Sequence, residues 1–193
     1  MLISRFFAAI VATSLLLAPV SATAFDLGKI FKGGKTLAAH EVAIDMAEAV
    51  RIISDYRRKH GLSALKLDDK LTKVAADHAI RMAKMDKVDH VLRGEGSFSK
   101  RLAAGGYDAA VASENIGGGY DTIEEAFAGW RKSKEHNKNM LRPDVTVMGI
   151  ARADSKGSKY GSYWSLVLAA PYEGPPPGMA GGPTAGPIIQ IRP

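Results

Sequence analysis

Two kinds of hydrophobic periodicity follow one another along the chain, and their order limits the folds that it can adopt. Across residues 39–60 and again across 71–85, apolar residues recur every three or four positions, which is the period of an amphipathic helix. Later, Val145–Ala153 and Tyr160–Ala170 are apolar or alternating and are separated by turn residues, which predicts an antiparallel β-hairpin. Helices followed by a mixture of helix and strand predict a single α+β domain, which we place at residues 39–172.

Capping residues and glycines predict where other elements begin and end. Asp68 or Asp69 can cap the second helix, and a short third helix is predicted over Ser97–Ala104, before a pair of glycines. The sequence SENIGGGY at 113–120 is predicted to be a loop, because its three glycines allow backbone shapes that other residues avoid. A fourth helix is predicted to follow this loop.

The two ends of the chain differ in composition from the domain. Residues 1–24 combine a positively charged start, an apolar run at Phe6–Val20 and the small residues Ala22-Thr23-Ala24, which is the pattern of a cleavable export signal. That run is shorter than the roughly 20 residues of a transmembrane helix, so we expect no stable membrane span after cleavage. Residues 25–38 are a short lead-in, and 173–193 are predicted to be a flexible Gly/Pro-rich tail. The protein is therefore expected to be exported, and periplasmic or extracellular.

The composition excludes several classes of chemistry. The chain has no cysteine, so it has no disulfide, no thiolate metal site and no cysteine nucleophile. Its 26 Lys and Arg against 20 Asp and Glu are interspersed, which suits an anionic envelope surface or simply keeps the protein soluble. The export signal and the lack of a nucleic-acid reading motif argue against nucleic acid as a partner. Without a G-x-S-x-G motif, a Ser-His-Asp hydrolase is not supported.

Two histidines and a glutamate form the candidate functional site: His90, Glu114 and His136. Imidazole and carboxylate are the side chains that bind metals or move protons near neutral pH. Two imidazoles can hold a divalent ion such as Zn²⁺, with water or a carboxylate completing the shell. Each residue also has a structural alternative, in which it interacts with a helix end, caps a loop or forms a buried hydrogen bond.

Other polar residues of the chain are assigned to structural roles. His60 lies at the end of the first predicted helix, and His40 precedes that helix's apolar stripe. His78 lies within the stripe of the second helix and is predicted to be a core histidine. Asn115 is predicted to form a turn.

Five segments occur in the order typical of a known family. They are AVRIISDYRRKHGLSALKLDDKLTKVAADHAIRMAKMDKVDH, SENI, AGWRKSKEHNKNML, VMGIARA and YGSYWSLVLA. Over residues 46–171 the chain therefore resembles the CAP superfamily of cysteine-rich secretory, antigen 5 and pathogenesis-related proteins, in its disulfide-free, SCP-like bacterial branch. The resemblance implies an α-β-α sandwich, with a small antiparallel sheet between helical layers.

The resemblance also implies a cleft lined by two histidines and two acidic residues. Matched by motif, three of these positions are His90, Glu114 and His136. The fourth, three residues after the tryptophan, is Ser133 instead of an acid. Glu95 and Glu135 are close in sequence and are candidates to replace the missing carboxylate, although neither matches the motif.

Three functions are consistent with these residues, and binding is favoured over catalysis. The first is an exported binding module, whose cleft holds Zn²⁺ or another divalent cation weakly through His90 and His136, supported by Glu114, Asn115 and Ser133. A small ligand, lipid or envelope component is the expected partner. The second is a metal- or His/Glu-dependent hydrolase of envelope peptides or glycans, which the missing acid disfavours. The third is a structural or interaction domain without a ligand.

Overall fold

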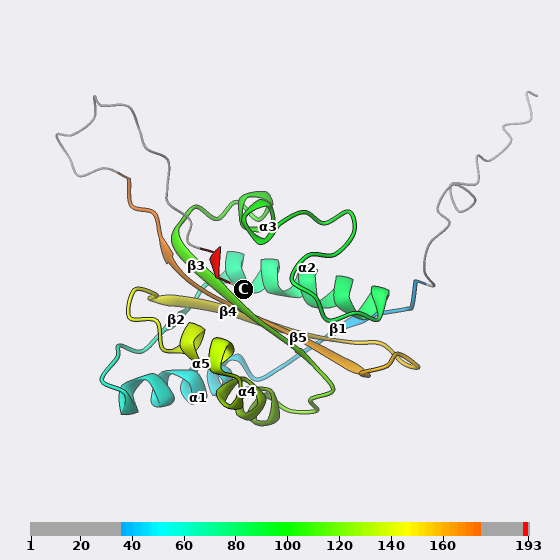
Figure 1. The fold of residues 1–193 in the computed structure, drawn as a ribbon, viewed down its shortest axis with the longest axis horizontal. Helices are drawn as coiled ribbons and strands as arrows, with labels where there is room; N and C mark the ends of the chain where they lie inside the picture. The colour runs from blue at the N-terminus through cyan, green and yellow to red at the C-terminus, as the bar shows by residue number, and fades with distance from the viewer. Residues whose placement is uncertain (1–35, 175–190, 193) are drawn as a thin grey trace, which may run out of the picture. The chain divides into compact units, whose positions relative to one another are not determined.

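One sheet runs through the middle of the described part of the chain, with helices on both of its faces (Figure 1). The computed structural model describes residues 36–174 and 191–192. The expected export signal at 1–24 therefore lies outside the described residues, as do most of the lead-in and most of the tail. Within the described ranges, no helix is long and apolar enough to cross a membrane.

The strands lie in the order β1-β4-β5-β3-β6, and β2 pairs with β4 beside this path. They are β1 (His40–Val42), β2 (Lys66–Leu67), β3 (Ala109–Gly118), β4 (Val147–Asp154), β5 (Ser162–Pro171) and β6 (Ile191–Arg192). β4 and β5 pair antiparallel, which confirms the predicted hairpin. The central strand, β5, is buried from Ser162 to Ala169 because helices cover both faces of the sheet.

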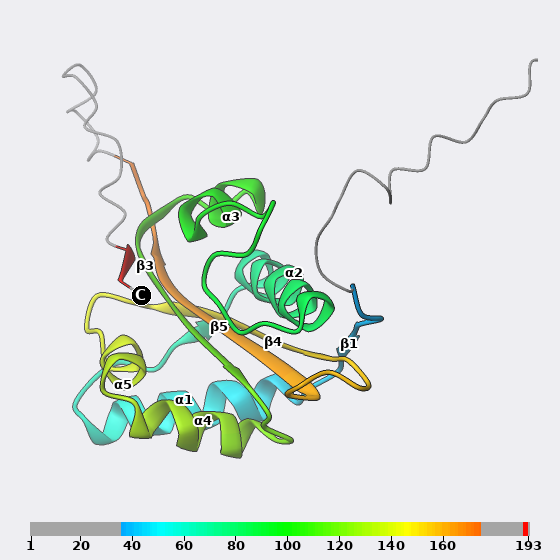
Figure 2. The same cartoon turned by 45° about the vertical axis from the view of Figure 1, so that its right-hand side comes forward.

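The helices form two layers, one on each face of the sheet. They are α1 (Met46–Lys59), α2 (Asp69–Met85), α3 (Phe98–Ala104), α4 (Ile123–Lys132) and α5 (Lys134–Met140). Figure 2 shows α2 and α3 on one side of the sheet and α1, α4 and α5 on the other. Each layer has its own hydrophobic core, one including Leu102 and Val167 and the other Trp130 and Trp164. This α+β sandwich confirms the predicted fold class.

Four of the helices begin at a capping residue that is recognisable in the sequence. In each case the side-chain oxygen of the N-cap residue accepts the backbone N–H three positions further on, which satisfies a donor that the helix leaves free. These caps are Asp45, Asp68, Ser97 and Thr122. Asp68, one of the two predicted alternatives, therefore begins α2.

Gly149 allows α2 to lie directly on β4. A Cβ at this position would stand 2.2 Å from the backbone of both Leu71 and Thr72, well inside van der Waals contact. Only glycine fits there, because the obstructing atoms are backbone and cannot rotate away. The position of α2, which carries His78 and leads to His90, depends on this contact.

Arg57 joins α1 to the segment that follows α5. Its side chain is fully buried, and its guanidinium donates to the backbone carbonyls of Ser63 (2.9 Å), Met140 (2.8 Å), Arg142 (2.8 Å) and Val145 (3.2 Å). An arginine can serve four carbonyls because its planar head carries five N–H donors. Burial lowers the pKa of this side chain from its ordinary value.

The first helix is shorter than the periodicity predicted. The helix was expected across residues 39–60, whereas His40–Val42 forms β1 and the helix begins after Asp45. β1 pairs with Arg152–Asp154 of β4, so this short segment is an edge strand of the sheet. Pairing with a distant strand overrides the local pattern.

The predicted loop at 113–120 is wrong, because most of it belongs to the long strand β3. A Cβ on Gly117 would stand 2.8 Å from the ring of Tyr120, and one on Gly118 would stand 2.9 Å from the ring of Tyr160. These two glycines therefore make room for aromatic rings within a strand. Only the third, Gly119, has the positive φ (82°) expected of a turn.

The described end of the predicted tail also joins the sheet. Ile191–Arg192 forms β6 and pairs in parallel with Ala112–Ser113 of β3. Residues 175–190, which include most of the predicted flexible tail, lie outside the described residues. The domain boundaries at 39 and 172 stay predictions.

Candidate functional site

Glu114 is the centre of a buried polar network at the middle of β3. It is 1% exposed, and both of its carboxylate oxygens accept hydrogen bonds from Arg101 of α3, at 2.8 and 2.9 Å. Nδ1 of His90 lies 2.9 Å from the same carboxylate. The hydroxyl of Ser165 on β5 adds a longer contact at 3.4 Å. The structure thus brings together two of the predicted residues, His90 and Glu114.

The environment of Glu114 keeps its carboxylate ionised. Burial acts to raise its pKa, but hydrogen bonds from His90 and Arg101 and the nearby positive charges outweigh burial and lower the pKa to about 2. A carboxylate with so low a pKa holds no proton to give at neutral pH. Glu114 is therefore unsuited to act as a general acid.

Glu114 also determines which nitrogen of His90 is available to a ligand. An ionised carboxylate can only accept a hydrogen bond, so Nδ1 of His90 carries the proton in the 2.9 Å contact between them. The side chain of His90 is 30% exposed, and its other ring nitrogen, Nε2, has no hydrogen-bond partner among the described residues. A carboxylate behind a histidine in this way is the arrangement that commonly orients metal-binding imidazoles.

His136 lies on α5, and its imidazole is half-buried. Burial lowers the pKa of this imidazole, and the charge of His90 lowers it further. A lowered pKa keeps His136 neutral, which is the form that binds metals or accepts hydrogen bonds.

Asn115 fixes α5 against β3. Its amide donates to the backbone carbonyl of His136 at 3.0 Å, and its oxygen accepts from Asn139 at 3.0 Å. Asn139 also donates to the backbone carbonyl of Glu114, at 3.3 Å. The prediction that Asn115 forms a turn is wrong: it is a fully buried strand residue that positions His136.

A second carboxylate, Glu95, lies on the buried side of the network. One of its oxygens is 2.8 Å from Nδ1 of His78 and 3.9 Å from Nε of Arg101. His78 is fully buried, as predicted for a core histidine, but its Nε2 is 3.8 Å from Glu114. The described contacts of Glu95 are thus with buried side chains, His78 and Arg101, and its substitution for the missing acid stays a prediction. Glu135, the other candidate, is exposed on α5.

Ser133 lies between α4 and α5 and makes no side-chain capping bond. It borders a pocket of about 690 Å³ at the end of α4. The other lining residues are Gly119, Tyr120, Glu125, Ala128, Gly129 and Lys132. Neither candidate histidine is among them, so the role of Ser133 in the histidine cleft stays a prediction.

The donor set limits what kind of metal site is possible. Among the described residues, no group of three or more histidine, cysteine, aspartate or glutamate side chains is placed to hold a metal ion. Glu114 already uses both of its oxygens on Arg101 and His90. Glu114 is therefore not available as a ligand, and His90 and His136 stay the predicted ligands of any cation at this site.

Arg101 is absent from the sequence-based prediction, although the sequence contains a signal for it. Phe98, Arg101 and Leu102 lie on the same face of α3, and all three are buried. An arginine on the apolar face of a short helix needs a buried partner. That partner is Glu114.

Comparison with known proteins identifies the family. The family model for CAP, the cysteine-rich secretory protein family, matches residues 50–168. The chain belongs to this family. Its lack of cysteine agrees with the bacterial branch expected from the sequence. His90, Glu114, Ser133 and His136 all lie inside the matched region.

Relatives are similar to the chain in sequence, and solved structures share its fold. The chain is 31% identical over 130 residues to YkwD of Bacillus subtilis (strain 168), covering 67% of this chain and 49% of YkwD. It is 33% identical over 107 residues to the Bacillus subtilis membrane protein YlbC, covering 55% of this chain and 29% of YlbC. This CAP chain thus spans half or less of these relatives.

An outer surface protein from Borrelia burgdorferi has the same fold, with a TM-score of 0.59 and 22% identity over 70% of this chain and all of that one. The SCP-domain extracellular protein of Bacillus anthracis gives a TM-score of 0.57 and 24% identity, covering 64% of this chain and 39% of that one.

Proposed function

We propose that this protein is an exported CAP-family binding module in which His90 and His136 hold a divalent cation such as Zn²⁺ through imidazole nitrogens. The observation that carries the proposal is the 2.9 Å contact between Nδ1 of His90 and Glu114. It commits the Nδ1 proton to the carboxylate and leaves Nε2 with a lone pair. The half-buried, neutral imidazole of His136 supplies the second nitrogen.

Two nitrogen ligands alone predict weak, exchangeable binding. Zinc in proteins is usually four-coordinate, so two positions would be left for water or for oxygen atoms of a ligand. Those open positions are where an envelope component would bind. The site therefore suits recognition through a bound cation better than permanent structural metal binding.

The proposed location outside the cytoplasm rests on two observations. The first 24 residues have the composition of an export signal. Two proteins with the same fold are described as an outer surface protein and an extracellular protein. In an exported protein, a site with only two metal ligands can exchange its cation and its ligand with the surroundings.

Titration of the tag-free protein with Zn²⁺ in a calorimeter tests the proposal. We expect millimolar to micromolar affinity, which His90→Ala and His136→Ala each reduce by at least about tenfold. His40→Ala is the matched control, because His40 is exposed on the edge strand β1. Heat no greater than background, or an equal loss in His40→Ala, would contradict the proposal.

A further inference from the structure

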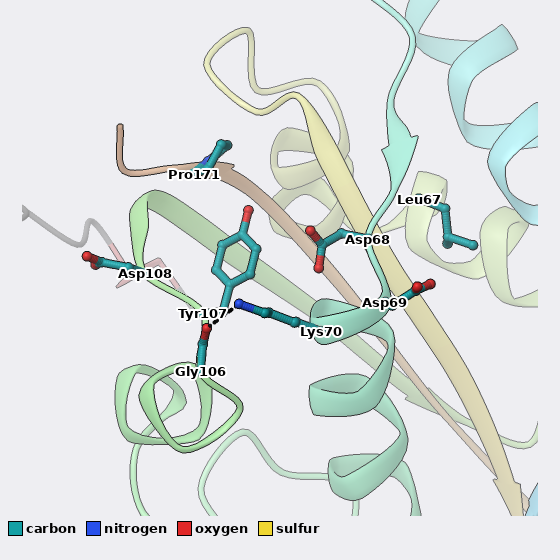
Figure 3. Close-up of a pocket in the computed structure, with 8 residues that line it drawn as sticks. All are labelled: Leu67, Asp68, Asp69, Lys70, Gly106, Tyr107, Asp108 and Pro171. Atoms are coloured by element: carbon teal, nitrogen blue, oxygen red, sulfur yellow. Dashed lines mark hydrogen bonds between the residues drawn. The ribbon is translucent and has the colours of Figure 1, made fainter. Parts of the chain in front are cut away.

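A second cavity lies at the start of α2, at the opposite end of that helix from His90. It has a volume of about 600 Å³, which is in the range of small-molecule sites. Figure 3 shows the residues that line it. They are Leu67, Asp68, Asp69, Lys70, Gly106, Tyr107, Asp108 and Pro171. None of these belongs to the network around Glu114.

Tyr107 provides a hydrogen-bonding group without a partner. Its side chain is 8% exposed, and its hydroxyl is buried with no hydrogen-bond partner among the described residues. In Figure 3 the ring rises into the space between Asp68 and Pro171, with the hydroxyl at its tip. Burial, together with the charge of Asp68, raises the pKa of this hydroxyl to about 12, so it remains a neutral donor. A ligand that accepted a hydrogen bond from this hydroxyl would satisfy a buried group that is otherwise unpaired.

The charge around the cavity is negative, although the whole chain carries a net charge of +6. Three carboxylates line it, and Asp68, Asp69 and Asp108 form no ion pair with any described residue. The one lining cation, Lys70, donates instead to the carbonyl of Gly106 at 3.0 Å. Asp68 uses one oxygen to cap α2 and has a second oxygen free to accept. The cavity therefore favours a positively charged ligand.

The arrangement argues against a bare metal ion. The three carboxylates are not close enough together for one cation, since no group of three acidic or histidine side chains in the described part of the chain can hold a metal. In Figure 3, Asp69 and Asp108 point away from the ring of Tyr107, and only Asp68 is directed toward it. The volume also exceeds what a single ion needs.

We propose that this cavity binds a small organic cation, through an ion pair between its ammonium group and Asp68 and a hydrogen bond from Tyr107. A ligand with an ammonium group and neighbouring hydroxyls, such as an amino sugar, meets both requirements. Leu67 and Pro171 provide the apolar part of the lining. The site is independent of the His90–His136 site.

Three sugars with the same ring separate the effect of charge from that of shape. Glucosamine is cationic, glucose is neutral and glucuronate is anionic. Each is titrated into ¹⁵N-labelled protein while backbone amide shifts are recorded. We expect glucosamine to shift the amides of residues 67–70 and 106–108, and the other two sugars to leave them unchanged. Glucosamine without effect up to about 50 mM, far above a millimolar Kd, would overturn the proposal, as would equal shifts with glucose.

Two variants test the named contacts without removing structural ones. Asp68→Ser keeps a good helix cap while removing the charge. Asp45→Ser is its matched control, because it makes the same change at the start of α1. Tyr107→Phe removes only the hydroxyl. We expect Asp68→Ser and Tyr107→Phe each to weaken glucosamine binding about five- to tenfold, and Asp45→Ser to have no effect.

Wild-type affinity in both Asp68→Ser and Tyr107→Phe would overturn the proposal. A thermal melt provides a second readout, because a hydroxyl without a partner adds no stability. Tyr107→Phe should therefore melt no lower than the wild type. A clear decrease would show that the hydroxyl has a partner within the protein, and this too would contradict the proposed role.

Discussion

Replacing Glu114 by glutamine removes the charge that the buried network is built around. The substitution leaves the shape almost unchanged but takes away the ion pair with Arg101, which is itself only 7% exposed. The free energy of unfolding should fall, since an unpaired buried charge typically costs about 3–5 kcal/mol. The pKa gives a similar value: folding lowers it from 4.5 to about 2, which corresponds to about 3 kcal/mol.

The same shift predicts how the effect depends on pH. Because folding lowers the pKa of Glu114, its stabilisation is fully present above the unfolded value of 4.5 and is lost as the pH falls toward about 2. Glu114→Gln should therefore be less stable than the wild type by about 3 kcal/mol near pH 7. The difference between the two proteins should shrink below about pH 4.5.

Urea denaturation followed by tryptophan fluorescence measures this difference, because Trp130 and Trp164 are both buried. Glu135→Gln is the matched control at an exposed glutamate of α5, and it should change the stability by less than about 0.5 kcal/mol. A loss in Glu114→Gln below about 1 kcal/mol, or one that is constant between about pH 3 and pH 7, would refute the reasoning.

Three further predictions concern the fold and the histidines. Arg57→Lys should lower the free energy of unfolding by about 3 kcal/mol or more, because a lysine cannot serve four carbonyls; an unchanged urea midpoint would contradict this. Gly149→Ala should lower the melting temperature sharply or prevent folding, since its Cβ would stand 2.2 Å from the backbone of α2; a wild-type melt would show that α2 lies further away. Burial and His90 lower the pKa of His136 from its ordinary value of 6.5, so in an NMR titration its imidazole should gain a proton only below that pH, and a midpoint at or above 6.5 would be inconsistent with its burial.

The periodic helices and the terminal hairpin were predictable because local rules decide them. Asp68 and Ser97 are good N-cap residues in front of apolar stripes, and both begin helices. β3 was not predictable, because Gly117 and Gly118 look like turn residues when their aromatic neighbours are unknown. Those neighbours, Tyr120 and Tyr160, include a residue that is distant in sequence. The strand therefore depends on packing that the local sequence does not reveal.

The candidate site was predictable in part. The resemblance to the CAP family named His90 and Glu114, and the structure places them in contact. Arg101 and the His78–Glu95 pair depend on how α2 and α3 lie against β3, which no local pattern specifies. The consequence for function is large, because Arg101 makes Glu114 a fixed anion rather than a free carboxylate.

Long-range ¹H–¹⁵N spectra of the histidine rings test the central claim most directly. They report which ring nitrogen of His90 carries the proton and which one changes when Zn²⁺ is added. The contact with Glu114 predicts that His90 is protonated at Nδ1 and that Zn²⁺ shifts Nε2 of His90 together with a ring nitrogen of His136. A proton on Nε2 of His90, or unchanged ring nitrogens at saturating Zn²⁺, would contradict the account.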